Sequence, residues 1–399
     1  MNTNETILFL NNIFQIPSSY QIPMQLSIDS KNILLNLALK INKIRCVKPT
    51  ITFLKGMKNI KTSVFYESIP IMIRQDINTK SYNQCKYELL LPSNRKINIY
   101  IITENQDKTN YISLYNKISL WLHFIDTITL STEYCKLLNI YLILNNCEKK
   151  LPIIRSTLLD PININSGFTF NCKEKNDIFI YRKEEVLKLL IHESFHSFNL
   201  DFSNMDQEYA NYVIKKTFHG LKNVTNDLRI YETYTEIWAE IITILIINKN
   251  NIYLSFNKIN ECFFYERLWS LYQCGKILHH YNMKMENLIH GSISTSTSTS
   301  TSALGYEKNT TPFSYFILKA ICFENLNDFL FLCNKMNKNV INFTNEIKNI
   351  ITFCNFLTKK KNLKHFIYKL DDINEWFLKG KIKSNHIYLL KTLRMSMYG

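Results

Sequence analysis

Three residues within the segment LLIHESFHSF, namely His192, Glu193 and His196, form the pattern H-E-x-x-H. On a helix, residues four positions apart share one face and lie about 6 Å apart. Two imidazoles placed in this way can bind one zinc ion at about 2.0–2.1 Å. Glu193 lies one position further round, where its carboxylate can take a proton from a metal-activated water as this water attacks a carbonyl. We therefore expect His192 and His196 to be metal ligands and Glu193 to be a general base.

The alternative interpretation is a pair of surface histidines beside a solvated glutamate. The motif lies within the apolar stretch 186–198 and follows the strand-like run 177–181, and this context favours the metal site. The expected cofactor is one Zn²⁺ ion.

A zinc site of this kind needs a third protein ligand. The extended pattern H-E-x-x-H-x-x-G-x-x-H is excluded, because Asn199 and Phe202 stand where it requires Gly and His. Downstream, Glu232, Glu236 and Glu240 recur every four residues on one stripe of a helix that becomes increasingly apolar, and carboxylates facing a core are costly unless they are paired or bind metal. Glu232 lies nearest the helix start, so we predict it as the ligand and Glu236 as a residue that holds a histidine or replaces Glu232. The alternative is that these three glutamates form the solvated face of an amphipathic helix.

These motifs resemble the zincin superfamily of metallopeptidases, and within it the glutamate-zincin branch. The segment E-T-Y-T-E-I-W-A, from Glu232 to Ala239, resembles that branch's pattern of a ligand Glu, a small residue three later and an acid four later. The resemblance covers residues 167–247. It implies a mixed sheet whose edge strand binds substrate, an active-site helix, and a second helix that supplies the glutamate. His196 and Glu232 are 36 residues apart, more than in compact members, so residues 203–225 must form an extra helix or loop.

The composition and the pair IHESFHSF and ETYTEIWAE also resemble uncharacterised zincin-like proteins of large DNA viruses. This second resemblance implies a viral protein of the host cytoplasm or the virion. Enzymes with this chemistry usually place a Tyr or His to stabilise the oxyanion. The candidates are Tyr315, which begins a helix after a Ser/Thr-rich segment, and Tyr231, Tyr234 and His219. The chain has 23 tyrosines, so simple packing is the alternative for each of them.

Helices and strands must position these residues, and their expected pattern predicts an α+β protein. In it, a zincin-like catalytic domain with a mixed sheet precedes a mainly helical C-terminal part. We expect an N-terminal mixed α/β region at 1–117, the catalytic domain at 118–291, a flexible Ser/Thr insert at 292–304, and a helical region at 305–399 that completes the catalytic unit. Helices are expected at 29–44, from near 182, from 226 or 227 to about 247, and at 313–333, 340–357 and 363–397. Strands are expected at 51–54, 63–66, 69–73, 87–91, 97–102, 138–144, 167–170 and 177–181. Pro70 restricts the third of these to an edge strand, and 118–129 fits either a helix or a strand.

Charge and cysteine usage limit the other functions. Lys and Arg number 48 against 33 Asp and Glu, a net charge of +15, yet no dense basic cluster stands out, so a nucleic-acid partner is the weakest alternative. The ten cysteines include no Cys-x-x-Cys pair, and the first residues lack a basic signal-peptide region. No apolar run reaches the ~18 residues of a membrane span.

We expect an intracellular zinc metallopeptidase that acts on peptide or protein. The alternatives are another zinc amide hydrolase and a catalytically silent zincin-like binding or virion protein.

Overall fold

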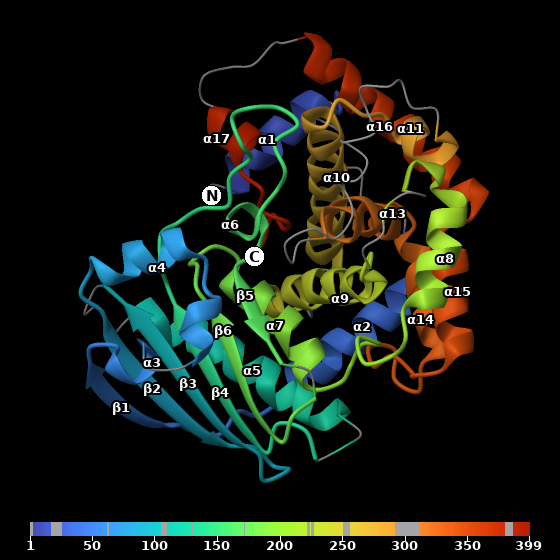
Figure 1. Cartoon of the computed structure of the whole chain (residues 1–399). Coiled ribbons are helices and arrows are strands. Elements are labelled where there is room, and N and C mark those ends of the chain that lie inside the picture. Colours follow the sequence, from blue (N-terminus) through green and yellow to red (C-terminus); the bar gives the residue numbers. More distant parts are fainter. Residues whose placement is uncertain are drawn as a thin grey trace.

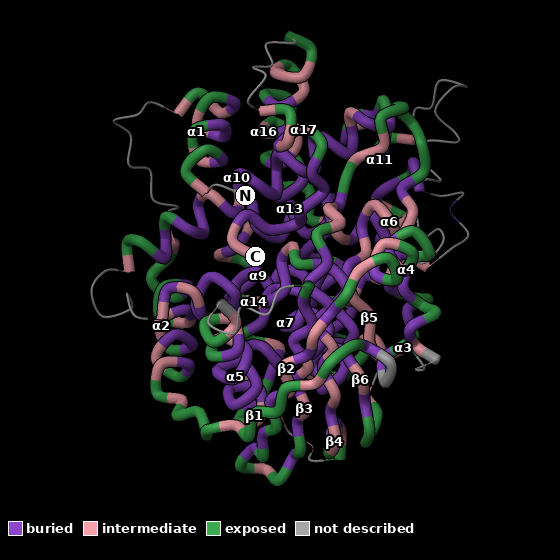
Figure 2. The backbone as a smooth tube through the Cα atoms, turned by 90° about the vertical axis from the view of Figure 1, so that its left-hand side faces the viewer, coloured by how far each residue is buried: buried purple, intermediate pink, exposed green. Residues whose placement is uncertain are grey.

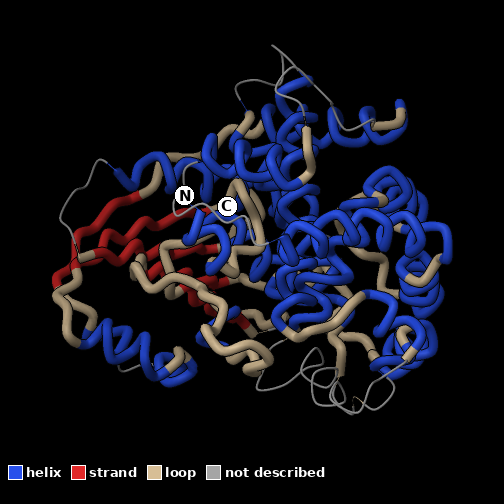
Figure 3. Tube along the Cα trace, turned by 90° about the horizontal axis from the view of Figure 1, so that it is seen from above, coloured by secondary structure: helices blue, strands red, loops and turns tan. Residues whose placement is uncertain are grey.

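A mixed six-stranded β-sheet forms one side of the protein and helices form the other, as a computed structural model of the whole chain shows (Figures 1 and 3). The structure describes residues 3–16, 26–61, 64–104, 110–129, 131, 133–170, 172–221, 224, 227–249, 256–291, 311–379 and 386–399. The strands are β1 (Thr50–Lys55), β2 (Asn83–Leu90), β3 (Lys96–Thr103), β4 (Leu137–Ile143), β5 (Gly167–Thr169) and β6 (Lys175–Ile180). Their order across the sheet is β1-β2-β3-β4-β6-β5, with β3, β4 and β6 parallel and the other neighbours antiparallel. The predicted α+β class is confirmed.

The two faces of the sheet bury different elements. Alternate side chains of β3, β4 and β6, such as Ile99, Ile140 and Ile178, belong to the large core that the sheet shares with the helices. On the opposite face, Ile102 and Ile143 belong to a smaller cluster. Three short elements cover that cluster: α3 (Lys58–Lys61), the 3₁₀ turn η1 (Val64–Ser68) and α4 (Ile71–Asn78). The sheet therefore packs against the main body of helices on one face and against these short elements on the other, and the site described below lies at its β5 edge.

Two of the predicted strands, 63–66 and 69–73, are wrong. The described residues of the first, 64–66, belong to the 3₁₀ turn η1, and the second is the start of α4, with Pro70 at its N-cap. Proline suits a helix start because its missing N–H would have no partner there. Ile73 and Ile77, four positions apart, are both fully buried in the smaller cluster. A run of isoleucines that reads as a strand therefore forms one face of a helix.

The helices before the catalytic motif are α1 (Thr3–Ile13), α2 (Ile28–Lys43), α5 (Asn110–Ile128) and α6 (Pro161–Ile164). The predicted helix at 29–44 is confirmed as α2, and the ambiguous run 118–129 belongs to α5. The region 203–225, predicted to form an extra helix or loop, contains α8 (Glu208–Thr217) and η2 (His219–Leu221).

Most of the C-terminal part is helical, as predicted. Two helices, α10 (Phe256–His280) and α11 (Met285–His290), precede it. The described part of 305–399 contains the π-helical segment η4 (Phe313–Leu318), α13 (Lys319–Glu324), α14 (Leu326–Met336), α15 (Ile347–Leu357), α16 (Lys360–Lys379) and α17 (Ile387–Lys391). The single helix predicted at 313–333 is interrupted at Asn325, and the one predicted at 340–357 begins only at Ile347. The insert predicted at 292–304 lies entirely outside the described residues.

The molecule's largest apolar cluster runs from Phe9 to Met397 and takes in residues from the sheet and from most of the helices (Figure 2). At its centre lie α7 (Val186–Ser197), whose twelve residues are all buried, and α9 (Ile230–Ile247).

Within the described part of the chain, every helix is too short or too polar to span a bilayer. All ten cysteines are free.

Candidate metal centre

The site is built by two buried helices that pack against each other, α7 and α9. Each is preceded by a residue in the left-handed conformation, Glu185 with φ of 56° and Arg229 with φ of 47°. Such a residue cannot continue a right-handed helix, so each helix starts just after it. This explains why both helices begin a few residues later than the sequence predicts, at Val186 and Ile230.

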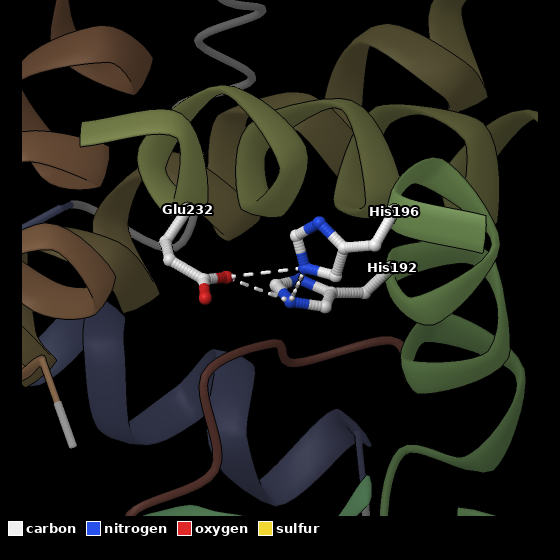
Figure 4. Close-up of side chains that lie close together, drawn as sticks. All are labelled: His192, His196 and Glu232. Carbon is white, nitrogen blue, oxygen red and sulfur yellow. Dashed lines mark hydrogen bonds and ion pairs between the residues drawn. The ribbon is translucent and has the colours of Figure 1, made fainter. Parts of the chain in front are cut away.

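The structure brings His192 and His196 of α7 together with Glu232 of α9 (Figure 4). The Nε2 atoms of the two histidines lie 3.2 Å apart. Oε2 of Glu232 lies 3.1 Å from Nε2 of His192 and 3.4 Å from Nε2 of His196. All three side chains are buried. Residues that are up to 40 positions apart in the sequence therefore direct one ligand atom each at a common point.

The other ring nitrogen of each histidine faces a buried carboxylate. Nδ1 of His192 lies 2.8 Å from Oε2 of Glu236, the residue predicted to hold a histidine. Nδ1 of His196 is in close contact with Oδ2 of Asp201. The Asp201 carboxylate is itself held, because it accepts hydrogen bonds from the hydroxyls of Thr235 and Ser203 at 2.9 and 2.7 Å. When Nδ1 of each ring carries the proton, each Nε2 keeps a lone pair directed at the common point.

This geometry fits a zinc ion. In a tetrahedral site with bonds of about 2.0–2.1 Å, the ligand atoms lie about 3.3–3.4 Å from each other. The three separations of 3.1, 3.2 and 3.4 Å agree with that spacing. In addition, Oε2 of Glu232 is buried and accepts no hydrogen bond from the described residues. With the proton of each ring on Nδ1, three lone-pair atoms face one another, and a cation between them removes their repulsion.

The pKa shifts show how strongly the carboxylates act on the rings. Burial alone would lower the pKa of His192, but the contacts with Glu232 and Glu236 outweigh it and raise this pKa to about 9. Burial likewise opposes the charge of His196, and Asp201 and Glu232 raise its pKa well above the usual value. The carboxylates thus provide strong negative potential at the two rings. A metal ion competes with protons for the same nitrogens, so the same potential favours zinc.

Glu193 lies beside the three ligand atoms but is not part of the ligand group. Its side chain lines the cleft, and burial raises its pKa. Gly167 of β5 makes room for it, because a Cβ at this position would lie 3.3 Å from Oε1 of Glu193 and 2.9 Å from the Phe179 carbonyl oxygen. The edge strand can therefore approach the carboxylate only because residue 167 has no side chain.

The three ligands and Glu193 open onto a cleft of about 660 Å³, and the edge strand β5 lines it on one side. Tyr315, on the π-helical segment η4, lines the same cleft, and its ring centre lies 6.2 Å from that of His192. Tyr231 also lines it, with its ring 5.8 Å from that of His196. The other two oxyanion candidates lie elsewhere: Tyr234 is in the core, where its hydroxyl donates to the Ile341 carbonyl at 2.7 Å, and the exposed His219 is not part of the cleft lining.

Two residues at the site were not found from the sequence. Asp201, five positions after His196, has a weak local signal: Asp followed two residues later by Ser is typical of a turn, and its hydrogen bonds with Ser203 form such a turn. Lys188 lies one helical turn before His192 and contacts Glu236. A lysine in an apolar helix gives no local sign of its partner.

Comparisons with family models, with curated proteins and with solved structures find no match for this chain.

Proposed function

We propose that this protein is a zinc-dependent metallopeptidase of the zincin type, with His192, His196 and Glu232 as ligands of one zinc ion. The observation that carries the proposal is the tetrahedral spacing of three buried lone-pair atoms, 3.1–3.4 Å apart, around a point that opens onto a cleft. The carboxylates behind both histidines support it, because zinc-ligating histidines generally donate their second N–H to such groups.

When bound, zinc would supply a Lewis acid that polarises a carbonyl and lowers the pKa of water to about 7. The protein's own residues would do the rest. Glu193 would accept the proton of the attacking water and pass it to the leaving amine, and its raised pKa brings it closer to neutral pH, where a general base works best. Tyr315 would direct its hydroxyl at the oxygen on which negative charge develops.

The position of β5 supports a peptide as the substrate. Among the described residues this strand pairs only with β6, and its other edge borders the cleft, where an extended chain could lie. Addition of a strand to such an edge is a common mode of peptide recognition. The ten free cysteines support the intracellular location that is part of this proposal.

The experiment is an unbiased peptide-library digest with zinc-loaded wild type, with Glu193→Gln as its matched control. We expect wild type to cleave peptides, and Glu193→Gln to keep its zinc and lose ~10²–10⁴-fold or more of the activity, because an amide cannot take the proton. Zinc-loaded wild type that cleaves no peptide would contradict the peptidase proposal and leave a metal-containing binding module. Equal cleavage by the variant would remove Glu193 from the role of base.

A further inference from the structure

A buried lysine lies directly behind the ligand histidines. Lys188 is on α7, one helical turn before His192, and its side chain is fully buried. Its Nζ forms an ion pair with Oε1 of Glu236, whose side chain is only 1% exposed. A lysine is almost never fully buried unless it is paired, so this contact requires an explanation beyond packing.

Glu236 uses its two carboxylate oxygens for two different partners. Oε1 meets Lys188, and Oε2 lies 2.8 Å from Nδ1 of His192. The three residues thus form a continuous buried chain from a lysine through a carboxylate to a ring whose Nε2 faces the metal position. A buried carboxylate remains charged only where a cation or several donors compensate for its lost hydration.

We infer that Lys188 is a positioning residue that orients Glu236, so that Glu236 in turn fixes the ring of His192 with Nε2 toward the metal. This inference rests on the proposed zinc site and adds a residue behind it. With Lys188 absent, Oε1 of Glu236 would lose its ion-pair partner, and the carboxylate would no longer be held in the orientation that places Oε2 against Nδ1 of His192. The ring would then lose the contact that sets its tautomer and orientation.

The surroundings of Lys188 favour its charged form. Burial opposes the charge, but three carboxylates act in its favour, those of Glu236, Glu185 and Glu240. Together they raise the pKa of Lys188 above its usual value. Its remaining neighbour is the thioether sulfur of Met395, at 3.7 Å, which gives no hydrogen bond comparable to that of a carboxylate. Lys188 is therefore present as a cation where Glu236 needs one.

The structure offers a matched control in Lys319. This lysine is also fully buried and pairs at 2.7 Å with Glu240, one helical turn further along α9. Neither Lys319 nor Glu240 contacts a ligand histidine in the described structure. Replacing either lysine by Met breaks one buried ion pair, so their general costs for folding are similar, but only Lys188 pairs directly with the carboxylate that contacts a ligand histidine.

The test measures the zinc affinity of the folded proteins by competition with a chromophoric chelator. We expect Lys188→Met to lower zinc affinity by about 10–100-fold, the usual effect of losing a partner behind a ligand histidine. Lys319→Met should change it by less than about threefold. Equal zinc affinities of Lys188→Met and wild type would overturn the inference, and so would equal losses in both lysine variants. Wild type without zinc affinity would instead contradict the proposed function.

A second pair of variants covers the case in which Lys188→Met does not fold. Lys188→Met is also made in the Glu236→Gln background, where no buried carboxylate is left uncompensated. If Lys188 acts through Glu236, this double variant binds zinc at least as tightly as Glu236→Gln alone. A further loss of 10-fold or more in the double variant would show that Lys188 acts on the metal site by another route and would overturn the inference.

Discussion

The two sides of the helix pair α7 and α9 both bury charged residues, but they balance them differently. On the cleft side, the carboxylate of Glu232 faces only the two histidines, with no lysine or arginine ion pair among the described residues. On the side that faces the C-terminal segment, two carboxylates each have a lysine: Glu185 pairs with Lys149 and Glu240 pairs with Lys319. One side already contains its cations, whereas the other has a surplus of negative charge.

This difference separates a ligand from a structural glutamate on a single helix. Glu232, Glu236 and Glu240 follow one another at every fourth residue of α9, and all three are buried. The first faces the metal position, the second bridges His192 and Lys188, and the third belongs to a lysine pair. Because all three are buried, burial does not distinguish their roles. The presence or absence of a lysine partner does.

The largest expected effect is the loss of zinc in Glu232→Ala. This change removes the one ligand oxygen and leaves two imidazoles, which are too few for a stable protein zinc site. Elemental analysis after zinc reconstitution should find no stoichiometric zinc. Glu240→Gln, eight residues further along the same helix, is the control and should keep about one zinc per chain. Zinc retained by Glu232→Ala at wild-type affinity would contradict the assignment of this ligand.

Tyr315→Phe removes a single hydroxyl from the cleft wall. Loss of one donor to a developing oxyanion typically costs about 10²–10³-fold in kcat. We expect a decrease of that size in peptide hydrolysis with KM and zinc content unchanged. Tyr231→Phe provides the comparison, since this tyrosine also lines the cleft but lies beside His196. A kcat unchanged by Tyr315→Phe, or lowered more by Tyr231→Phe, would exclude Tyr315 as the oxyanion donor.

On the side with the buried lysine pairs, the titration of Glu266 should make the free energy of unfolding depend on pH. Burial raises the pKa of Glu266 to about 7, although Lys319 and the backbone N–H of Met397 favour its charged form. The folded protein therefore holds this proton up to about pH 7, whereas the unfolded chain releases it near pH 4.5. Stability from this group is present at acidic pH and is lost as the pH rises from about 4.5 to about 7.

Glu266→Gln should remove that dependence, because glutamine keeps an acceptor and does not titrate. The free energy of unfolding of wild type, taken relative to the variant, should fall by on the order of 3 kcal/mol between pH 4.5 and pH 7.5. Denaturant titrations of both proteins across this range measure it. A difference between the two proteins that does not change with pH would show that Glu266 has an ordinary pKa.

The smallest effect on the metal is expected for Glu236→Ala. This variant keeps all three ligands but leaves Nδ1 of His192 without its carboxylate, so zinc affinity should fall by about 10–100-fold and stoichiometric loading should remain. Asp201→Ala removes the corresponding partner of His196 and should have a similar effect. Chelator competition compares them with Glu232→Ala. Weaker zinc binding in Glu236→Ala than in Glu232→Ala would move the third ligand to Glu236.

Much of the fold could be predicted from the sequence where the signal is local. The α+β class, the strands β3 and β4, and the helix α7 that carries His192 all follow from residue spacing over short stretches of the sequence. The helix α4 was predicted wrongly as a strand because its isoleucines are β-branched, and such residues favour strands. Their burial in the smaller cluster on the outer face of the sheet stabilises the helix instead.

The same limit applies to the candidate site. His192, Glu193 and His196 share one helical face, so their spacing alone predicts that they lie together. The pairing of His196 with Asp201 and of Lys188 with Glu236 depends on how the chain turns after α7 and on how α9 crosses it. No short pattern encodes that crossing, and the choice among the glutamates of α9 needed the three-dimensional contacts.

The most direct test of the central claim is the zinc content of the purified wild-type chain. The protein is stripped with chelator, incubated with excess zinc and dialysed, and the metal is measured by elemental analysis against protein concentration. The geometry of His192, His196 and Glu232 predicts about one zinc per chain, bound tightly enough to survive dialysis. A folded wild-type protein that stays without zinc after this treatment would contradict the account.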